Sequence, residues 1–171
     1  MSRPEKNEYA EYYDRYVSLV DETDIVAVLQ NQLVEMQNLF AGISEEKGVY
    51  AYAEGKWTIK ELIGHLSDGE KIFAYRALRI SRADQTPMEG FEQDGYVENA
   101  DFNSRQLADL AEEFTLLRRA NNLFFKSLTA EAWRRRGTAS GAEVSVRALG
   151  FIMVGHVRHH ANILRERYLN Q

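Results

Sequence analysis

The four histidines of the chain are its most informative residues. His65 stands alone, whereas His156, His159 and His160 follow closely on one another near the C-terminus. At about 100° per helical residue, His156 and His160 lie about 40° apart on one helix face, and His159 lies about 100° from His160. An i,i+4 pair can present two imidazole nitrogens to one metal ion, and His65 supplies a third candidate ligand.

A structural role is the alternative for these residues. A lone histidine on an apolar face is more often a hydrogen-bonded core residue than a ligand. The chain also lacks the glutamate of the HExxH motif, because Val157 and Arg158 follow His156. Burying three imidazoles without a shared ion, however, carries a desolvation cost that separate hydrogen bonds must offset. The residues alone leave the metal and core interpretations evenly balanced.

Helical periodicity marks four stretches that must position these side chains, and no stretch alternates like a strand. Thr58 and Glu61 have the spacing of a capping box at the start of the second stretch, and Asn103 and Gln106 have it at the third. The pattern predicts an all-α four-helix bundle in which His156 and His160 face the core and His159 lies at its border. The helices are expected at about 24–41, 58–82, 103–128 and 145–169.

The connection over residues 83–101 shows little helical pattern and contains Pro87, Gly90 and Gly95. A connection this long is either a plain crossover that makes the second and third helices parallel or a cover over a functional site. Its aromatic residues Phe91 and Tyr96 are expected to help wall a pocket. The fold prediction therefore includes a long crossover connection between the second and third helices.

One domain over residues 1–171 fits the length of the chain. Residues 1–22 are predicted to be an extension packed on the bundle, because their four tyrosines are spaced like one face of a short helix. The run Arg134 to Arg136 is interpreted as a solvated helix end. The tyrosines are Tyr9, Tyr12, Tyr13 and Tyr16.

Composition excludes several classes of function. A net charge of -5 argues against a nucleic-acid partner, which needs a basic footprint. The absence of cysteine removes disulfides and thiolate ligands. No apolar run approaches the length of a membrane span, and the first residues lack the core of a signal peptide. The sequence predicts a cytoplasmic protein with no membrane partner.

Three segments resemble the DinB-like superfamily of bacterial four-helix-bundle proteins: GKWTIKELIGHLSDGEKIFAYRALRI, GFEQDGYVENADFN and VRALGFIMVGHVRHHANILRERYL. The likeness runs from about Glu8 to Leu169. It implies a divalent ion, zinc or nickel, held by one histidine of the second helix and two of the fourth, which match His65, His156 and His160. Many relatives continue the last motif as HHRGQ, whereas this chain has HHANI, so any role of that glutamine is absent.

The resemblance also implies a class of reaction. Members include thiol-dependent transferases and isomerases that use bacillithiol or mycothiol, beside proteins of no known activity. We expect a metal-dependent S-transferase or hydrolase acting on a small electrophilic substrate, with a low-molecular-weight thiol as a possible cofactor. The alternative is a non-catalytic, stress-related binding or dimerisation module on the same fold. Dimers are common among similar proteins, and a homodimer is therefore expected.

Two charged residues of the second helix are further candidates. Asp68, one turn after His65, could orient the imidazole ring, although pairing with a neighbouring cation is the more common role of such an aspartate. Arg76 could hold an anionic group of a thiol cofactor, with pairing to a Glu or Asp on a neighbouring helix as the favoured alternative.

Overall fold

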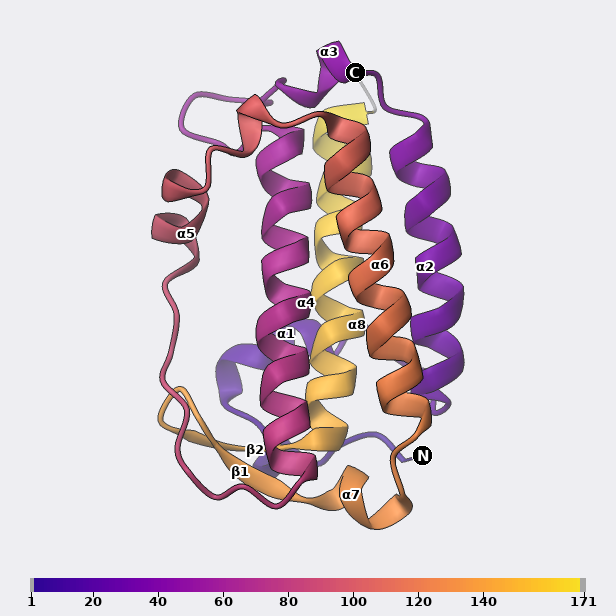
Figure 1. Cartoon of the computed structure of the whole chain (residues 1–171), viewed down its shortest axis with the longest axis vertical. Helices are drawn as coiled ribbons and strands as arrows, with labels where there is room; N and C mark the ends of the chain where they lie inside the picture. The colour runs from indigo at the N-terminus through magenta and orange to yellow at the C-terminus, as the bar shows by residue number, and fades with distance from the viewer. Residues whose placement is uncertain (1, 170–171) are drawn as a thin grey trace.

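Four long helices dominate the structure, a computed structural model that describes residues 2–169 (Figure 1). The expected all-α four-helix bundle is confirmed, with bounds close to those predicted from periodicity. The final turn continues past the last long helix as a π-helical segment, Leu164–Leu169. Within residues 2–169, no helix has both the length and the apolar character that crossing a membrane requires. The long helices are α2 (Ile25–Ala41), α4 (Ile59–Ser81), α6 (Leu107–Lys126) and α8 (Val146–Ile163).

The helices form a square in which α4 and α2 each pack against both α6 and α8. In Figure 1, α4 and α6 run downward, whereas α2 and α8 run upward. Because α4 and α6 are parallel neighbours, the chain between them must return along the full length of the bundle. The expected crossover is therefore present, on the outside of α4 (Figure 1).

The crossover is more ordered than its sequence suggested. It contains α5 (Gln93–Asn99), which Glu92 caps by accepting hydrogen bonds from the N–H groups of Asp94 and Gly95. A short 3-10 turn, Phe102–Ser104, follows before α6 begins. The sequence of this connection shows little helical pattern because α5 is a single short helix whose apolar positions are too few to set up a visible period.

The start of α4 was predicted correctly, and that of α6 was not. The Thr58 hydroxyl accepts the N–H of Glu61 and the Glu61 carboxylate accepts the N–H of Thr58. Helix α6 has no side-chain cap from its own sequence, and the carboxylate of Glu45, at the start of α3 (Glu45–Gly48), accepts the N–H of Leu107 instead. Asn103 instead hydrogen-bonds Thr58 and Glu61. Tertiary contacts thus replaced the predicted local cap.

A β-hairpin that periodicity did not reveal precedes α8. Its strands, β1 (Arg136–Ala139) and β2 (Ala142–Ser145), pair antiparallel, with Arg136 opposite Ser145. The arginine run was expected to be a solvated helix end. Instead it leaves α7 (Ala130–Arg134) and enters β1, and Arg135 donates to the Ser81 carbonyl and pairs with Glu131. Strands of four residues are too short to show alternation.

The N-terminal segment packs on the bundle. It forms two 3-10 turns, Lys6–Glu8 and Glu11–Tyr13, and then α1 (Asp14–Val17), which contacts α8. Gly155 allows this approach, since a Cβ there would lie 2.1 Å from the Tyr16 carbonyl oxygen. The segment therefore places its tyrosines directly beside the histidine-bearing part of α8.

The core is divided into two apolar clusters, one at each end of the bundle. Each long helix contributes apolar residues to both clusters and buried polar residues to the layer between them. Those polar residues include Gln32 of α2, Glu70 of α4, Arg118 and Asn121 of α6, and His156 of α8. The bundle thus holds a polar layer across its middle.

Candidate metal centre

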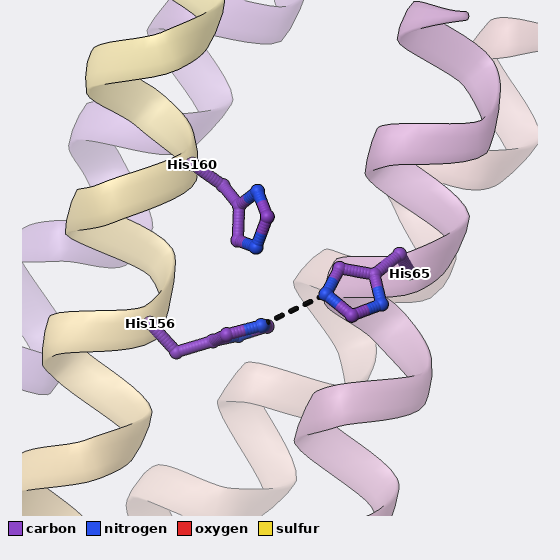
Figure 2. Close-up of side chains that lie close together, drawn as sticks. All are labelled: His65, His156 and His160. Carbon is purple, nitrogen blue, oxygen red and sulfur yellow. Dashed lines mark hydrogen bonds between the residues drawn. The ribbon is translucent and has the colours of Figure 1, made fainter. Parts of the chain in front are cut away.

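Three histidines from α4 and α8 converge inside the bundle (Figure 2). His65 of α4 faces His156 and His160 of α8, and the Nε2 atoms of His65 and His156 lie 2.9 Å apart. One ring nitrogen from each residue lies within 4.8 Å of those of the other two. The i,i+4 pair and the antiparallel neighbour thereby point three nitrogen donors at a common space.

Burial keeps these rings uncharged. His65, His156 and His160 are 2%, 4% and 9% exposed. Burial lowers the pKa of His65 to about 4 and lowers the pKa values of His156 and His160 well below the usual range, with further lowering from the neighbouring histidines. Neutral imidazoles offer lone pairs at pH 7, so no proton has to leave before a cation binds.

Aromatic rings enclose the histidine centre. Trp57 lies 4.7 Å from the His65 ring and stacks at 6.4 Å on His160, measured between centroids. Tyr16 and Phe73 make edge contacts with His156 at 5.3 and 5.6 Å. These contacts fix the orientation of the imidazoles and exclude water from most of their surface.

Gly69 provides the space for the His156 ring. A Cβ at this position of α4 would lie 3.0 Å from the Cε1 atom of His156. That approach is closer than ordinary van der Waals contact, so a larger residue would push the imidazole away from His65. The glycine one turn after His65 therefore belongs to the architecture of the centre.

A cavity of about 360 Å³ opens beside the centre. Its lining combines His65 and His156 with residues of the N-terminal segment, the crossover and the hairpin turn. Such a volume suits a small molecule. The other lining residues are Ala10, Tyr12, Tyr13, Tyr16, Phe73, Phe91, Glu92, Gln93 and Ser140.

Other hollows are larger but do not contain the histidine pair. One of about 710 Å³ lies between α2, α3 and α6 and is lined by no histidine. Another, about 430 Å³, is lined by Trp57, His160 and Tyr168 and by neither of the other two converging histidines. The 360 Å³ cavity is the better candidate substrate site, because two of the three converging histidines line it.

The remaining sequence candidates lie at different distances from the centre. His159 is half-buried at its edge, against Tyr16, and is outside the converging group. Asp68 pairs with Lys71 at 3.3 Å, and no hydrogen bond joins it to a histidine in the described part of the chain. Phe91 lines the cavity, whereas Tyr96 packs on Phe91 from outside and is 50% exposed.

Arg76 does not pair with a Glu or Asp side chain, which was the favoured expectation. It is buried, and its guanidinium donates to the Glu89 carbonyl and to the Ser140 hydroxyl. The crossover brings the carbonyl of Glu89 to the Arg76 guanidinium. The positions of the two residues in the sequence do not predict this contact.

Several residues of the site could not be selected from the sequence. Trp57 lies just before the cap of α4, and Phe73 lies two turns after His65. Their spacing from His65 was the only sequence feature that could have suggested a place near the histidines. Tyr16 contacts His156 and also lines the cavity. Ser140 and Gly141 form a Ser-Gly dipeptide, which is typical of a turn, but the sequence does not indicate that this turn reaches the cavity.

The donor set fits a divalent cation. Nitrogens bound to one ion at about 2.0–2.1 Å lie about 2.9–3.4 Å apart for ligand angles of about 90–109°. The separation of 2.9 Å between His65 and His156 is already in that range. The remaining separations, up to 4.8 Å, would shorten by side-chain rotation. Imidazole nitrogen suits zinc and nickel among the divalent metals.

Comparison with known protein families and structures agrees with this geometry. The profile of the DinB superfamily matches residues 29–164, which span α2 to the end of α8 and include all three converging histidines. No curated protein sequence matches the chain significantly.

Two solved structures share the fold. YfiT from Bacillus subtilis, described as a probable metal-dependent hydrolase with an unusual four-helix bundle topology, is 17% identical, with a TM-score of 0.67 over 96% of this chain and 90% of its own. A mycothiol-dependent maleylpyruvate isomerase is 14% identical, with a TM-score of 0.70 over 85% of this chain. This chain covers 61% of that isomerase, and at these identities the likeness concerns the fold alone.

Proposed function

Because the chain belongs to the DinB superfamily, we propose that it is a divalent-metal-dependent enzyme acting on a small electrophilic substrate. The observation that carries this proposal is the convergence of three buried, neutral imidazoles, two of which line a cavity of about 360 Å³. A histidine cluster that served only to pack the core would not need to line a hollow large enough for a small molecule.

His65, His156 and His160 are the proposed ligands. All three are uncharged at pH 7, and no carboxylate joins the converging group in the described residues, so an ion held there would keep its full double charge. A zinc or nickel ion would supply Lewis-acid activation of a water or thiol nucleophile near neutral pH. Three protein ligands leave coordination positions open, which distinguishes a catalytic site from a closed structural one.

The residues around the centre have two further proposed tasks. Tyr16, Phe73 and Trp57 exclude bulk water, which strengthens electrostatic interactions at the site. Tyr12, Tyr13 and Phe91 form an aromatic wall that would bind the apolar part of a substrate.

The nucleophile distinguishes two reactions on this site. Water would make the protein a hydrolase, the description given to YfiT. A low-molecular-weight thiol such as bacillithiol or mycothiol would make it a transferase, and the isomerase of the same fold is described as mycothiol-dependent. Both reactions need the same three ligands and the same open cavity.

Elemental analysis of protein purified without a metal-affinity tag tests the proposal first. We expect about one equivalent of zinc or nickel. The loaded protein is then assayed for hydrolysis of activated esters and for thiol transfer to an aromatic halide, with His65→Ala as the inactive control. Metal without turnover in either assay would favour the non-catalytic binding module, and no bound metal would contradict the proposal.

We also infer a homodimer. Helices α2 and α6 pack side by side and expose large apolar side chains: Val34 at 56%, Leu116 at 54% and Leu123 at 71%. A twofold interface over these helices would bury them. Light scattering at micromolar protein concentration should give twice the mass of the chain, and a monomer mass would contradict this inference.

A further inference from the structure

Arg76 lies on the same face of α4 as His65. The two residues are 11 positions apart, which corresponds to about three helical turns and a rise of about 16 Å, with an angular offset of about 20°. Phe73 lies between them on this side of the helix and contacts both His156 and Tyr13. His65 lines the 360 Å³ cavity, whereas Arg76 is buried behind it and lines a neighbouring hollow of about 550 Å³ that shares Phe91 with the cavity.

The charge of Arg76 has no counter-charge. Three cationic side chains are buried in residues 2–169: Lys60, Arg76 and Arg118. Lys60 pairs with Glu45 at 2.5 Å and Arg118 pairs with Glu70 at 2.5 Å. Arg76 is 3% exposed and makes no salt bridge with any described carboxylate. A buried cation without an anion is costly, and an anionic ligand would offset that cost.

The neighbours of Arg76 connect it to the cavity. Its Nη2 atom donates to the Ser140 hydroxyl at 2.9 Å, its Nη1 atom lies 3.5 Å from the Tyr13 hydroxyl, and the guanidinium lies 5.8 Å from the centre of the Phe91 ring. All three neighbours line the 360 Å³ cavity. A hydroxyl that accepts from a guanidinium still has its own proton to donate, so Ser140 and Tyr13 can donate into the cavity.

The hairpin turn has the geometry that brings Ser140 to this position. Ser140 and Gly141 have φ values of 53° and 75°, which is the pattern of a two-residue type I′ turn. The N–H of Ser140 donates to the carbonyl of Met88, so the crossover holds the turn. Arg76 binds the next carbonyl of that segment, at Glu89. The hydroxyl, the crossover and the guanidinium are thus held together.

We propose that the cavity takes a small molecule with a carboxylate group, which binds at the Arg76 end while its reactive group lies at the histidines. The Ser140 and Tyr13 hydroxyls donate to the carboxylate, and the Arg76 charge stabilises it. This inference rests on the proposed function for the reactive end of the ligand. Glu92, the carboxylate that lines the cavity, is exposed and accepts the N–H groups of Asp94 and Gly95, so solvent screens it.

Matched probes test the carboxylate site. The protein is loaded with cobalt(II), and binding of 6-mercaptohexanoate and of 6-mercaptohexan-1-ol is followed by the thiolate-to-cobalt absorption. We expect the acid to bind at least about tenfold more tightly than the alcohol, because charge-assisted hydrogen bonds exceed neutral ones by this order. The shorter 3-mercaptopropionate should lose most of this advantage, since it cannot span the cavity.

Substitutions identify the residues that cause the protein to bind the acid more tightly than the alcohol. Arg76→Gln should bring the affinities for acid and alcohol to within about twofold, and Arg76→Lys should keep part of the difference. Ser140→Gly should also reduce the difference, and its backbone is undisturbed because the positive φ at this position suits glycine. Arg79→Gln is the matched control, since Arg79 pairs with Asp84 and does not line the cavity. Metal content should be equal in all four variants.

The outcomes separate this inference from the proposed function. Equal affinities of the wild-type protein for acid and alcohol, or loss of the ratio in Arg79→Gln as well, would overturn the carboxylate site. If the protein takes up no metal, calorimetry with hexanoate and hexan-1-ol replaces the thiols. A preference for hexanoate that Arg76→Gln removes would then support the carboxylate site although the metal proposal had failed, and equal binding would contradict it.

Discussion

Two buried polar clusters lie in the same bundle, and they differ in how their polar groups are satisfied. In the first, the Glu70 carboxylate accepts two hydrogen bonds from Arg118 and one from Asn121. Gln32 accepts from Arg118 and donates to the carbonyl of Val154, so all four long helices take part. In the second, three imidazoles face one another, and His65 and His156 also line an open cavity.

The difference between the clusters assigns their roles. The Glu70–Arg118 cluster is neutral overall and hydrogen-bonded within itself, so it needs no ligand and specifies how the four helices pack. The histidine cluster has one internal hydrogen bond, between the Nε2 atoms of His65 and His156, and no internal anion, so its uncharged rings keep lone pairs that a cation can bind. Burial alone does not indicate a functional site; lone pairs that converge beside a cavity do.

The largest expected effect is on the closed cluster. Glu70→Ala leaves the fully buried Arg118 without its counter-charge and should lower the free energy of unfolding by about 3–5 kcal/mol. Urea denaturation followed by circular dichroism measures the loss. The matched control is Glu35→Ala, which breaks the exposed pair with Arg165 and should cost less than about 1 kcal/mol. Equal effects of the two substitutions would remove the distinction between the clusters.

The open cluster should contribute stability only through its ligand. A chelator should lower the free energy of unfolding of the metal-loaded protein by about 2.7 kcal/mol when free metal had been present at about 100 times its Kd. His65→Ala, His156→Ala and His160→Ala should each lose the metal and with it the response to the chelator. Differential scanning calorimetry measures the loss of stability on adding the chelator, and elemental analysis measures the metal content.

His159→Ala is the control for this second prediction. His159 lies outside the converging group, so its removal should leave both the metal content and the chelator response unchanged. A variant at position 159 that empties the site, with His160→Ala still loaded, would show that the ligands had been assigned in the wrong register.

The smallest effect is expected at the wall of the cavity. Phe91→Ala removes a ring that lines the cavity and should weaken the binding of 6-mercaptohexan-1-ol by about three- to tenfold at constant metal content. Tyr96→Ala, which thins the outer layer against Phe91, should have a smaller effect. Titration of the cobalt-loaded variants measures both. If neither substitution changes thiol affinity, the crossover is a plain connector.

The sequence by itself determined the features that depend on local geometry. The period of 3.6 residues placed four helices within a few residues of their bounds. The same period put His156 and His160 on one face and His159 to the side. The capping box at Thr58 was readable because both partners lie within one turn. Each of these properties involves residues less than two turns apart.

Only the tertiary structure decided the features that join distant segments. The cap of α6 comes from Glu45, the partner of Arg118 is Glu70, and Ser140 reaches Arg76 through a turn that no sequence period marks. The cavity itself is assembled from the N-terminal segment, α4, the crossover, the hairpin and α8. Such contacts depend on how whole helices pack and on where the crossover over residues 82–106 returns along the bundle, and the side-chain spacing within any one segment carries no information about either.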